Sequence, residues 1–204
     1  MLIVGLTGSL GMGKTTAAAH LRARGLPVFD ADAEVHRLYA TTAAPLIEAA
    51  FPGATRDGKV DRERLAMVLM AEPQRFAELE AIVHPLVRAS ERAFLNEEAA
   101  RGSAIAVLEI PLLFETGADQ KVDATIVVSA PADVQRRRLA HREGFDAKKI
   151  DSLLARQIPD AEKRARADFV VDTSQSIEAS GAALDAIIEK LRGHRRRAYA
   201  LYWA

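Results

Sequence analysis

A glycine-rich run close to the first residue constrains this chain more than any other feature. Residues 8–15 read Gly-Ser-Leu-Gly-Met-Gly-Lys-Thr and match the pattern G-x-x-x-x-G-K-[S/T]. The apolar residues 2–6 before the run are typical of a buried parallel strand, and residues 16–21 after it favour a helix. The motif binds nucleotide phosphates when strand, loop and helix follow in this order. The sequence therefore predicts a triphosphate site, and the flanking pattern disfavours the alternative of a glycine-rich turn with an incidental lysine.

The residues of this run have distinct expected roles. Glycines lack a Cβ, so the loop can wrap closely and direct its backbone N–H groups at phosphate oxygens, beside the partial positive charge of the helix N-terminus. Lys14 would reach the β- and γ-phosphates, and the Thr15 hydroxyl would complete the coordination of a Mg²⁺ ion that arrives with the nucleotide. The predicted nucleotide contacts of this segment are Gly8, Ser9, Leu10, Gly11, Met12, Gly13, Lys14, Thr15 and Thr16.

Composition bounds the class of protein. The chain has 204 residues, no cysteine and a formal net charge of zero. This length suits one α/β domain that carries an insertion, and disulfides are excluded. Because the first predicted strand begins at residue 2 and no apolar run approaches the length of a membrane span, we expect a cytoplasmic protein without a signal peptide. The zero net charge argues against nucleic acid or a membrane as partners, and we expect a monomer or a small homo-oligomer.

Apolar runs predict a parallel sheet interrupted by two helical segments. The expected strands are residues 2–6, 26–29, 105–108, 124–128 and 169–171. We therefore expect an α/β fold of three layers, in which a five-stranded parallel sheet is covered by helices. Its nucleotide-binding core would comprise residues 1–32, 104–131 and 167–204. Apolar residues at helical spacing predict a helical insertion at 33–103 and a helical lid at 132–166.

Local signals set some of the expected helix boundaries. Two helices of the lid should be separated by residues 143–146, and a final helix should run over residues 177–192. His84 precedes Pro85, which disfavours helical geometry, so this pair should mark a helix boundary. The basic run 194–197 and the aromatic residues after it suggest RNA or membrane contact, but a solvated, frayed terminus is the interpretation we favour.

Acidic residues follow two of the predicted strands, and ligands of such sheets bind at the carboxyl ends of the strands. Asp30 and Asp32 follow the second strand. One of them is a candidate general base that orients an acceptor hydroxyl, and the alternative is a cap on the next helix. Glu109 closes the third strand, where an acidic residue can lie near a Mg²⁺ ion, although apolar stretches often end in a charge. Both pairs of alternatives stay open.

Basic residues are concentrated in the predicted lid. Residues 135–166 contain ten Lys or Arg against five Asp or Glu. Arg138 and Arg142 are four residues apart and share a face of one predicted helix. Guanidinium groups bind phosphates and stabilise the charge that spreads over a transferred phosphoryl group. This face is therefore predicted to close over a polyanion, with a solvated helix face as the alternative.

In the order of these segments, the chain resembles the dephospho-coenzyme A kinase family along nearly its whole length. The motifs that carry the resemblance are Leu6-Thr7-Gly8, residues 28–32, His84-Pro85-Leu86, residues 110–115, Gln135 with Arg138, Leu139 and Arg142, and Gln157 with residues 163–169. The resemblance implies the P-loop kinase fold. It also implies transfer of the ATP γ-phosphoryl group to the ribose 3′-hydroxyl of dephospho-coenzyme A, the last step of coenzyme A biosynthesis.

The resemblance further implies roles for single residues. Asp32 would be the catalytic base, and Lys14 and Thr15 would contact the phosphates and Mg²⁺. Arg138 and Arg142 would bind ATP, and Arg142 would act in catalysis when the lid closes and excludes water. The implied acceptor contacts are Asp32, His84 and Leu113.

Several positions depart from the residues usual in that family. Ser9 and Met12 stand where glycine and serine are frequent, and Thr15 stands where serine is usual. These residues leave the backbone cradle intact provided that Ser9 need not adopt a positive φ. Leu153 replaces a frequent arginine, which weakens the case for a phosphate contact from the second lid helix. Thr173 replaces a frequent asparagine, so we assign no adenine contact there.

Other classes of protein share the glycine-rich loop. A GTP-dependent switch protein typically needs an Asn-Lys-x-Asp element, which the sequence lacks. A nucleic-acid-stimulated ATPase should have a net basic face, and the zero net charge argues against one. A nucleoside kinase or a shikimate-type kinase would differ only in its acceptor, which makes this class the closest alternative.

Overall fold

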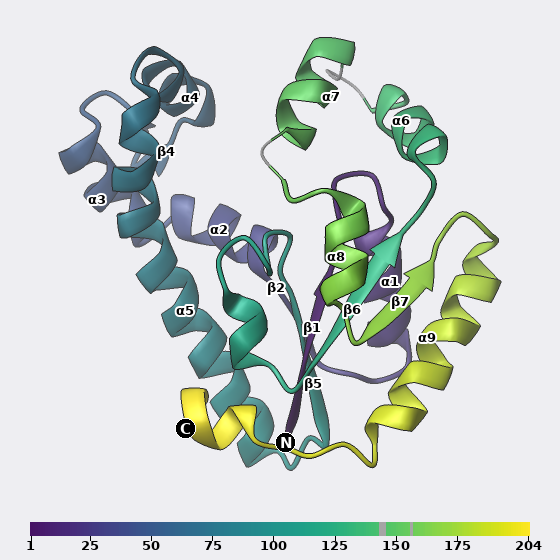
Figure 1. The fold of residues 1–204 in the computed structure, drawn as a ribbon. Coiled ribbons are helices and arrows are strands. Elements are labelled where there is room, and N and C mark those ends of the chain that lie inside the picture. The colour runs from purple at the N-terminus through teal and green to yellow at the C-terminus, as the bar shows by residue number, and fades with distance from the viewer. Residues whose placement is uncertain (143–145, 156) are drawn as a thin grey trace. The chain divides into compact units, whose positions relative to one another are not determined.

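The computed structural model describes the chain except residues 143–145 and 156 and the side chains of residues 147–149 (Figure 1). The described residues form two compact units, which we call the first and the second unit. The first comprises residues 1–29 and 95–204, and the second comprises residues 30–94. In the described part of the chain, no helix is both long and apolar enough to cross a membrane.

The first unit is built on a sheet of five described strands in the order β2-β5-β1-β6-β7. The strands are β1 (Leu2–Thr7), β2 (Val28–Asp30), β5 (Ile105–Glu109), β6 (Ala124–Ser129) and β7 (Phe169–Asp172). β1 pairs in parallel with β5 and β6, and β6 pairs in parallel with β7. All residues of β1, β5 and β6 are buried, which explains why their sequences are apolar runs without alternation. The predicted parallel sheet is confirmed, with strand boundaries that shift by one or two residues.

Helices cover both faces of this sheet. α1 (Lys14–Ala23) and α9 (Ile177–Leu191) pack against each other and against one face, in an apolar core that includes Leu21, Leu184 and Ile126. α8 (Asp160–Arg166) lies against β6 on the other face (Figure 1). The predicted three layers and the predicted final helix are therefore confirmed.

The segment predicted as a lid of two helices contains three described helices. They are α6 (Ala132–Ala140), α7 (Ala147–Leu154) and α8. The second predicted helix is broken before Pro159, because a proline disfavours helical geometry in the residue before it. The N–H of that residue, Ile158, donates instead to Glu115 Oε1 at 3.0 Å. The predicted break at residues 143–146 falls mostly outside the described residues.

A buried ion pair fixes α8 to the connection between β5 and β6. The Lys163 side chain is fully buried, and its Nζ lies 2.8 Å from Glu115 Oε1. On the same helix, the Arg166 guanidinium stacks 4.6 Å from the centroid of the Phe114 ring and pairs with Asp119 at 3.2 Å. Two segments that are about 50 residues apart in the sequence are thus joined by charge and by aromatic contact.

The second unit, residues 30–94, is mainly helical, and the helical insertion was predicted at residues 33–103. Its elements are α2 (Ala31–Tyr39), α3 (Ala43–Ala50), α4 (Arg62–Ala71), a 3-10 turn (Pro73–Arg75) and the beginning of α5 (Phe76–Ala100). They share an apolar core, which includes Leu38, Ile47, Phe51, Leu65 and Val83. This unit therefore has its own packed interior.

The second unit also contains a small hairpin that the prediction lacks. β3 (Thr55–Arg56) and β4 (Lys59–Val60) pair in antiparallel fashion around Asp57-Gly58. The two turn residues have φ values of 51° and 74°, which suits Asp and Gly. Strands of two residues are too short to produce a periodic pattern, so only the turn was visible in the sequence.

The helix boundary predicted at His84 is wrong. α5 continues through Pro85, which stands inside the helix. Apolar residues on both sides of the proline, such as Val83 and Leu86, pack into the core of the second unit, whereas His84 and Pro85 are exposed. An interior proline costs about 3 kcal/mol, and we attribute the continuous helix to burial of this apolar stripe.

The expectation of a frayed carboxyl terminus is also wrong. The backbone N–H groups of Arg197 and Ala198 donate to Asp123 Oδ1 at 2.7 and 2.8 Å. A short π-helix (Tyr199–Trp203) follows, in which the Trp203 side chain is buried and its indole N–H donates to the Lys121 carbonyl at 2.8 Å. The basic residues 194–197 suggested a solvated tail, and they are indeed exposed. The residues after them, however, anchor the terminus by apolar packing.

Candidate nucleotide site

The glycine-rich loop connects β1 to α1 in a conformation that requires glycine. Gly11 and Gly13 have φ values of 80° and 89°, in the left-handed region. At Gly8, a Cβ would lie 2.4 Å from the Val128 carbonyl oxygen, so a side chain cannot be accommodated there. Among the described non-glycine residues, Asp57 alone has a positive φ, so Ser9 meets the condition set for an intact cradle.

Lys14 and the start of α1 give the loop its positive charge. Lys14 is the first residue of α1, and its Nζ donates to the Gly8 carbonyl at 3.0 Å, across the loop. The first turn of α1 carries no acidic residue, and Thr15 and Thr16 are exposed. A helix N-terminus with free backbone donors attracts anions. These features suit the predicted contact with a polyphosphate.

Two glutamines from outside the loop hold the backbone of Leu10. Gln135 on α6 donates from Nε2 to the Leu10 carbonyl at 2.7 Å. Gln157, which precedes α8, accepts from the Leu10 N–H through Oε1 at 3.1 Å. Neither glutamine has a predicted role beyond its place in the family resemblance. Their spacing from the loop offers no local signal, because the two contacts bridge 125 and 147 residues of chain.

Arg138, predicted to bind ATP, contacts a carbonyl group of the loop. Its Nη1 donates to the Gly11 carbonyl at 3.4 Å, and its Nη2 donates to the Thr173 carbonyl at 2.5 Å. Arg142 follows α6 and is exposed. Within the described residues, its side chain has no hydrogen bond or ion pair. The structure thus brings one of the two predicted lid arginines to the loop.

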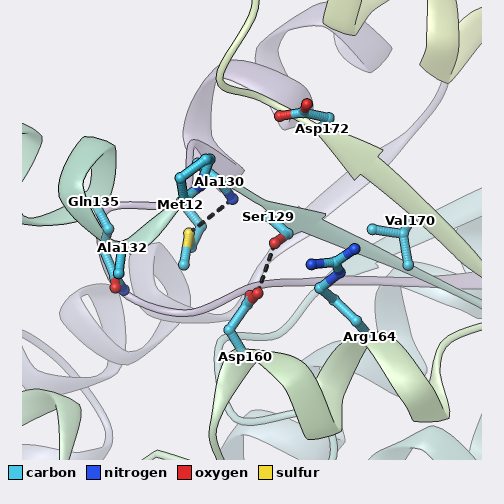
Figure 2. A pocket seen from close by; sticks show the side chains of 10 residues that line it. Met12, Ser129, Ala130, Ala132, Gln135, Asp160, Arg164, Val170 and Asp172 are labelled. Carbon is cyan, nitrogen blue, oxygen red and sulfur yellow. Dashed lines mark hydrogen bonds between the residues drawn. The ribbon is translucent and has the colours of Figure 1, made fainter.

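A pocket of about 470 Å³ lies beside the loop (Figure 2). Met12 contributes its side chain, and its Sδ accepts from the Ala130 N–H at 3.1 Å. Asp160 accepts from the Ser129 hydroxyl at 2.7 Å at the bottom of the view. The other lining residues are Pro131, Ala132, Gln135, Arg164, Val170 and Asp172. Met12 therefore lines this pocket and ties the loop to the residue after β6.

One carboxyl group of this pocket is held in its charged form. The hydroxyl and the backbone N–H of Ser174 lower the pKa of Asp172, and the charges of Arg164 and Arg138 add to the effect. The backbone N–H of Ser174 donates a hydrogen bond to Asp172 Oδ1, with an N–O distance of 2.8 Å. The carboxyl end of β7 thus keeps a negative charge at neutral pH.

The carboxyl end of β5 holds two further predicted residues. Glu109 is buried, and its Oε2 lies 3.8 Å from Arg22 Nη2. Leu113 is fully buried, and a Cβ placed on Gly5 would lie 2.9 Å from its Cδ2. The Leu113 side chain thus fills the space above a glycine in β1, and its contact with the acceptor stays a prediction. Among the described residues, no cluster of three His, Cys, Asp or Glu side chains could hold a metal ion.

The remaining predicted residues belong to the second unit. Asp30 caps α2, since its Oδ1 accepts from the Ala33 N–H at 2.9 Å. The capping role left open between Asp30 and Asp32 is therefore assigned to Asp30. Asp32 lies in the first turn of α2 and is exposed, and His84 is exposed on α5.

Comparisons with known proteins agree with this geometry. A family model described as Dephospho-CoA kinase matches residues 2–179. A protein from Mesorhizobium japonicum named Dephospho-CoA kinase is 52% identical over 195 residues, which cover 96% of this chain and 99% of the relative. A protein of the same name from Brucella melitensis is 53% identical over 193 residues, which cover 95% of this chain and 96% of the relative. A crystal structure from Thermus thermophilus is 38% identical with a TM-score of 0.80, covering 93% of this chain and 97% of that one.

Proposed function

This chain belongs to the dephospho-CoA kinase family, and from that premise we propose that it transfers the γ-phosphoryl group of ATP to the ribose 3′-hydroxyl of dephospho-CoA. The products would be coenzyme A and ADP, and the reaction would take place in the cytoplasm. The observation that carries the proposal is a family match over residues 2–179 that includes a complete glycine-rich loop with Lys14 at the start of α1. ATP and dephospho-CoA are the proposed partners.

The loop would bind the phosphates of ATP. Lys14 now donates to the Gly8 carbonyl at 3.0 Å, so its ammonium group already lies over the loop. We propose that it moves from this carbonyl to the β- and γ-phosphate oxygens when ATP binds. It would then stabilise the charge that spreads over the transferred phosphoryl group. Arg142 would add a second positive charge from the end of α6, since its exposed side chain has room to close on ATP.

Asp32 is the proposed catalytic base. Its neighbour Asp30 is occupied in part by the cap of α2, whereas Asp32 is exposed in the first turn of that helix. In a loose transition state the base mainly orients the acceptor hydroxyl and accepts its proton late. Asp32→Asn should therefore reduce turnover at least a hundredfold, on the order of a general-base contribution, while ATP binding is retained. The matched control is Glu63→Gln, an exposed acid in the first turn of α4.

Magnesium would be bound together with ATP. No cluster of acidic side chains among the described residues forms a site of its own, which fits an ion held mainly by phosphate oxygens and water. Thr15 fits as the protein ligand, because it is an exposed hydroxyl one residue after Lys14. Glu109 is the weaker candidate, since it is buried and lies 3.8 Å from Arg22. When bound, the ion would neutralise charge on the β- and γ-phosphates.

For the acceptor, His84 is the proposed contact from the second unit, since its imidazole is exposed on α5. Leu113 is proposed to support the sheet under the loop rather than to touch the acceptor, because its side chain is fully buried against Gly5. An alanine at either position separates these roles. His84→Ala should raise the KM for dephospho-CoA, whereas Leu113→Ala should lower the unfolding free energy by about 2 to 5 kcal/mol.

The proposal is tested by ADP release from the purified chain with Mg²⁺ and ATP, with and without dephospho-CoA. Mass spectrometry of the acceptor should find one added phosphate per ADP released. Release that does not depend on dephospho-CoA would contradict the proposal, and nucleosides and shikimate would then be the acceptors to test next. The variant Asp32→Asn serves as the reaction blank.

A further inference from the structure

We propose that Thr173 is a positioning residue that sets the shape of the glycine-rich loop for the phosphates of ATP. The inference deepens the proposed nucleotide site and rests on that site. Thr173 follows β7, 160 residues after the loop in the sequence, and its side chain is buried. It stands at a position to which the sequence assigned no contact.

The backbone and the hydroxyl of Thr173 join two segments. Its N–H donates to the Ser129 carbonyl at 2.8 Å, at the end of β6. Its Oγ1 donates to the Met12 carbonyl at 2.8 Å, and the Ser129 carbonyl lies at 3.2 Å as a longer second acceptor. The backbone bond fixes the residue in place, and the hydroxyl then holds the loop at Met12.

Arg138 completes this contact from α6. Its Nη1 donates to Thr173 Oγ1 at 3.2 Å and to the Gly11 carbonyl at 3.4 Å. The hydroxyl of Thr173 therefore accepts from Arg138 and donates to Met12. A Cβ placed on Gly13 would meet Thr173 Cβ and Oγ1 at 3.5 Å, in ordinary van der Waals contact. The Thr173 side chain thus also lies next to Gly13 of the loop.

The physical consequence concerns one backbone donor of the loop. The chain contains no described cis peptide bond, and in a trans peptide the C=O and the next N–H point in opposite directions. Binding of the Met12 carbonyl by Thr173 therefore directs the Gly13 N–H to the opposite side of the loop. That N–H immediately precedes Lys14 and α1, where anions bind. The hydroxyl orients a phosphate donor without touching the phosphate itself.

The test separates this role from simple packing. Thr173→Val keeps the shape of the side chain but removes the hydroxyl, and Thr173→Ser keeps the hydroxyl. The matched control is Thr125→Val, because Thr125 is equally buried in the sheet and its hydroxyl bonds Asp168 Oδ2 at 2.8 Å, near the start of β6. We measure the Kd for Mg²⁺-ATP by titration without acceptor, both KM values, and the unfolding temperature of the full chain.

Thr173→Val should raise the Kd for ATP by roughly tenfold, the upper range for one lost hydrogen bond, and leave the KM for dephospho-CoA near that of the wild type. Thr173→Ser should restore ATP binding. Thr125→Val should lower the unfolding temperature without changing the Kd. An unchanged Kd in Thr173→Val, an equal rise in Thr125→Val, or a failure of Thr173→Ser to restore binding would each overturn the proposal.

This experiment does not depend on the acceptor. A wild-type chain that binds ATP but leaves dephospho-CoA unmodified would contradict the proposed function, and the comparison of ATP affinities among the three variants would still decide the role of Thr173. A wild-type chain that binds no ATP would contradict both.

Discussion

The two ends of the sheet in the first unit use the same kind of bond for opposite purposes. At the carboxyl end, side chains from α6, from the segment before α8 and from the loop after β7 bind carbonyl or N–H groups of the glycine-rich loop; they are Gln135, Arg138, Gln157 and Thr173. At the amino end, Asp123 binds three backbone N–H groups, from Ile3, Arg197 and Ala198. The first set shapes a loop that offers donors to a ligand, whereas Asp123 uses donors to close the structure.

This difference implies that changes at the carboxyl end should affect activity and changes at the amino end should affect stability. Buried backbone groups need partners in either place. At the loop, however, we expect phosphate oxygens of ATP to be the hydrogen-bond acceptors of some backbone N–H groups. Variants at each end can therefore show whether the separation is real.

The largest effect is expected at the loop. Lys14→Met should lower kcat/KM for ATP by roughly a thousandfold, because a charge that stabilises the transferred phosphoryl group is lost. The unfolding temperature should change little, since the Lys14 side chain is only partly buried and its Nζ bonds a carbonyl of the loop, that of Gly8. Steady-state kinetics and calorimetry measure the two quantities, with the exposed Lys190→Met as the control. A large loss of stability in Lys14→Met would remove the proposed separation.

The next effect is expected at the amino end. Asp123→Ala should lower the free energy of unfolding by about 2 to 4 kcal/mol, because three N–H groups lose a charged acceptor. Urea unfolding of the full chain measures this loss. The kinetic constants for ATP should stay near those of the wild type at a temperature where the variant is folded.

A milder variant tests whether the tail shares in that loss. Trp203→Phe keeps a buried ring but removes the bond to the Lys121 carbonyl, so it should cost about 1 kcal/mol. If Asp123→Ala is no less stable than Trp203→Phe, Asp123 is not the centre of the amino end.

The sequence predicted the two ends of the sheet unequally. The loop has a motif because its φ values and close approaches admit glycine at Gly8, Gly11 and Gly13, and this constraint is local. The strands were equally visible because every residue of β1 and β6 is buried. Asp123 has no such signal. Its partners lie 120 residues before it and 74 residues after it, and only the folded chain brings them together.

Errors in prediction have the same origin. Pro85 and the carboxyl terminus were interpreted from local preference, and apolar packing overrode that preference in both places. The partners of the loop, Gln135, Gln157 and Thr173, have ordinary surroundings in the sequence, so their contacts could not be derived from spacing. By contrast, the cap formed by Asp30 and the approach of Arg138 to the loop follow from position relative to a strand or a helix face.

A smaller effect on activity is expected from Gln157. Gln157→Leu leaves the Leu10 N–H without its acceptor, while Gln135 still holds the carbonyl of the same residue. We expect the KM for ATP to rise about threefold to fivefold, in keeping with one neutral hydrogen bond at the edge of the loop. The control is Gln120→Leu, an exposed glutamine in the connection between β5 and β6. An unchanged KM would show that the bond from Gln157 does not shape the loop for ATP.

The smallest effect concerns a charged cluster between α1 and α9. Arg24 and then His20 bond to Asp185 and hold the pKa of its carboxyl group below the ordinary value; the bonds from Arg24 Nε and His20 Nε2 are 3.0 and 2.9 Å long. The folded protein thus binds fewer protons at this group than the unfolded chain near pH 4. The stabilisation is therefore complete above about pH 4, the unfolded pKa, and is lost as the pH falls through the lower folded pKa. Since the cluster is partly exposed, its contribution is roughly a few tenths of a kcal/mol.

Unfolding free energies measured from pH 6 to 3 should fall less steeply for Asp185→Asn than for the wild type. The control Asp133→Asn should follow the wild type, because Asp133 forms an exposed and looser pair with Arg137. Equal slopes in all three proteins would show that this cluster does not stabilise the packing of α1 on α9.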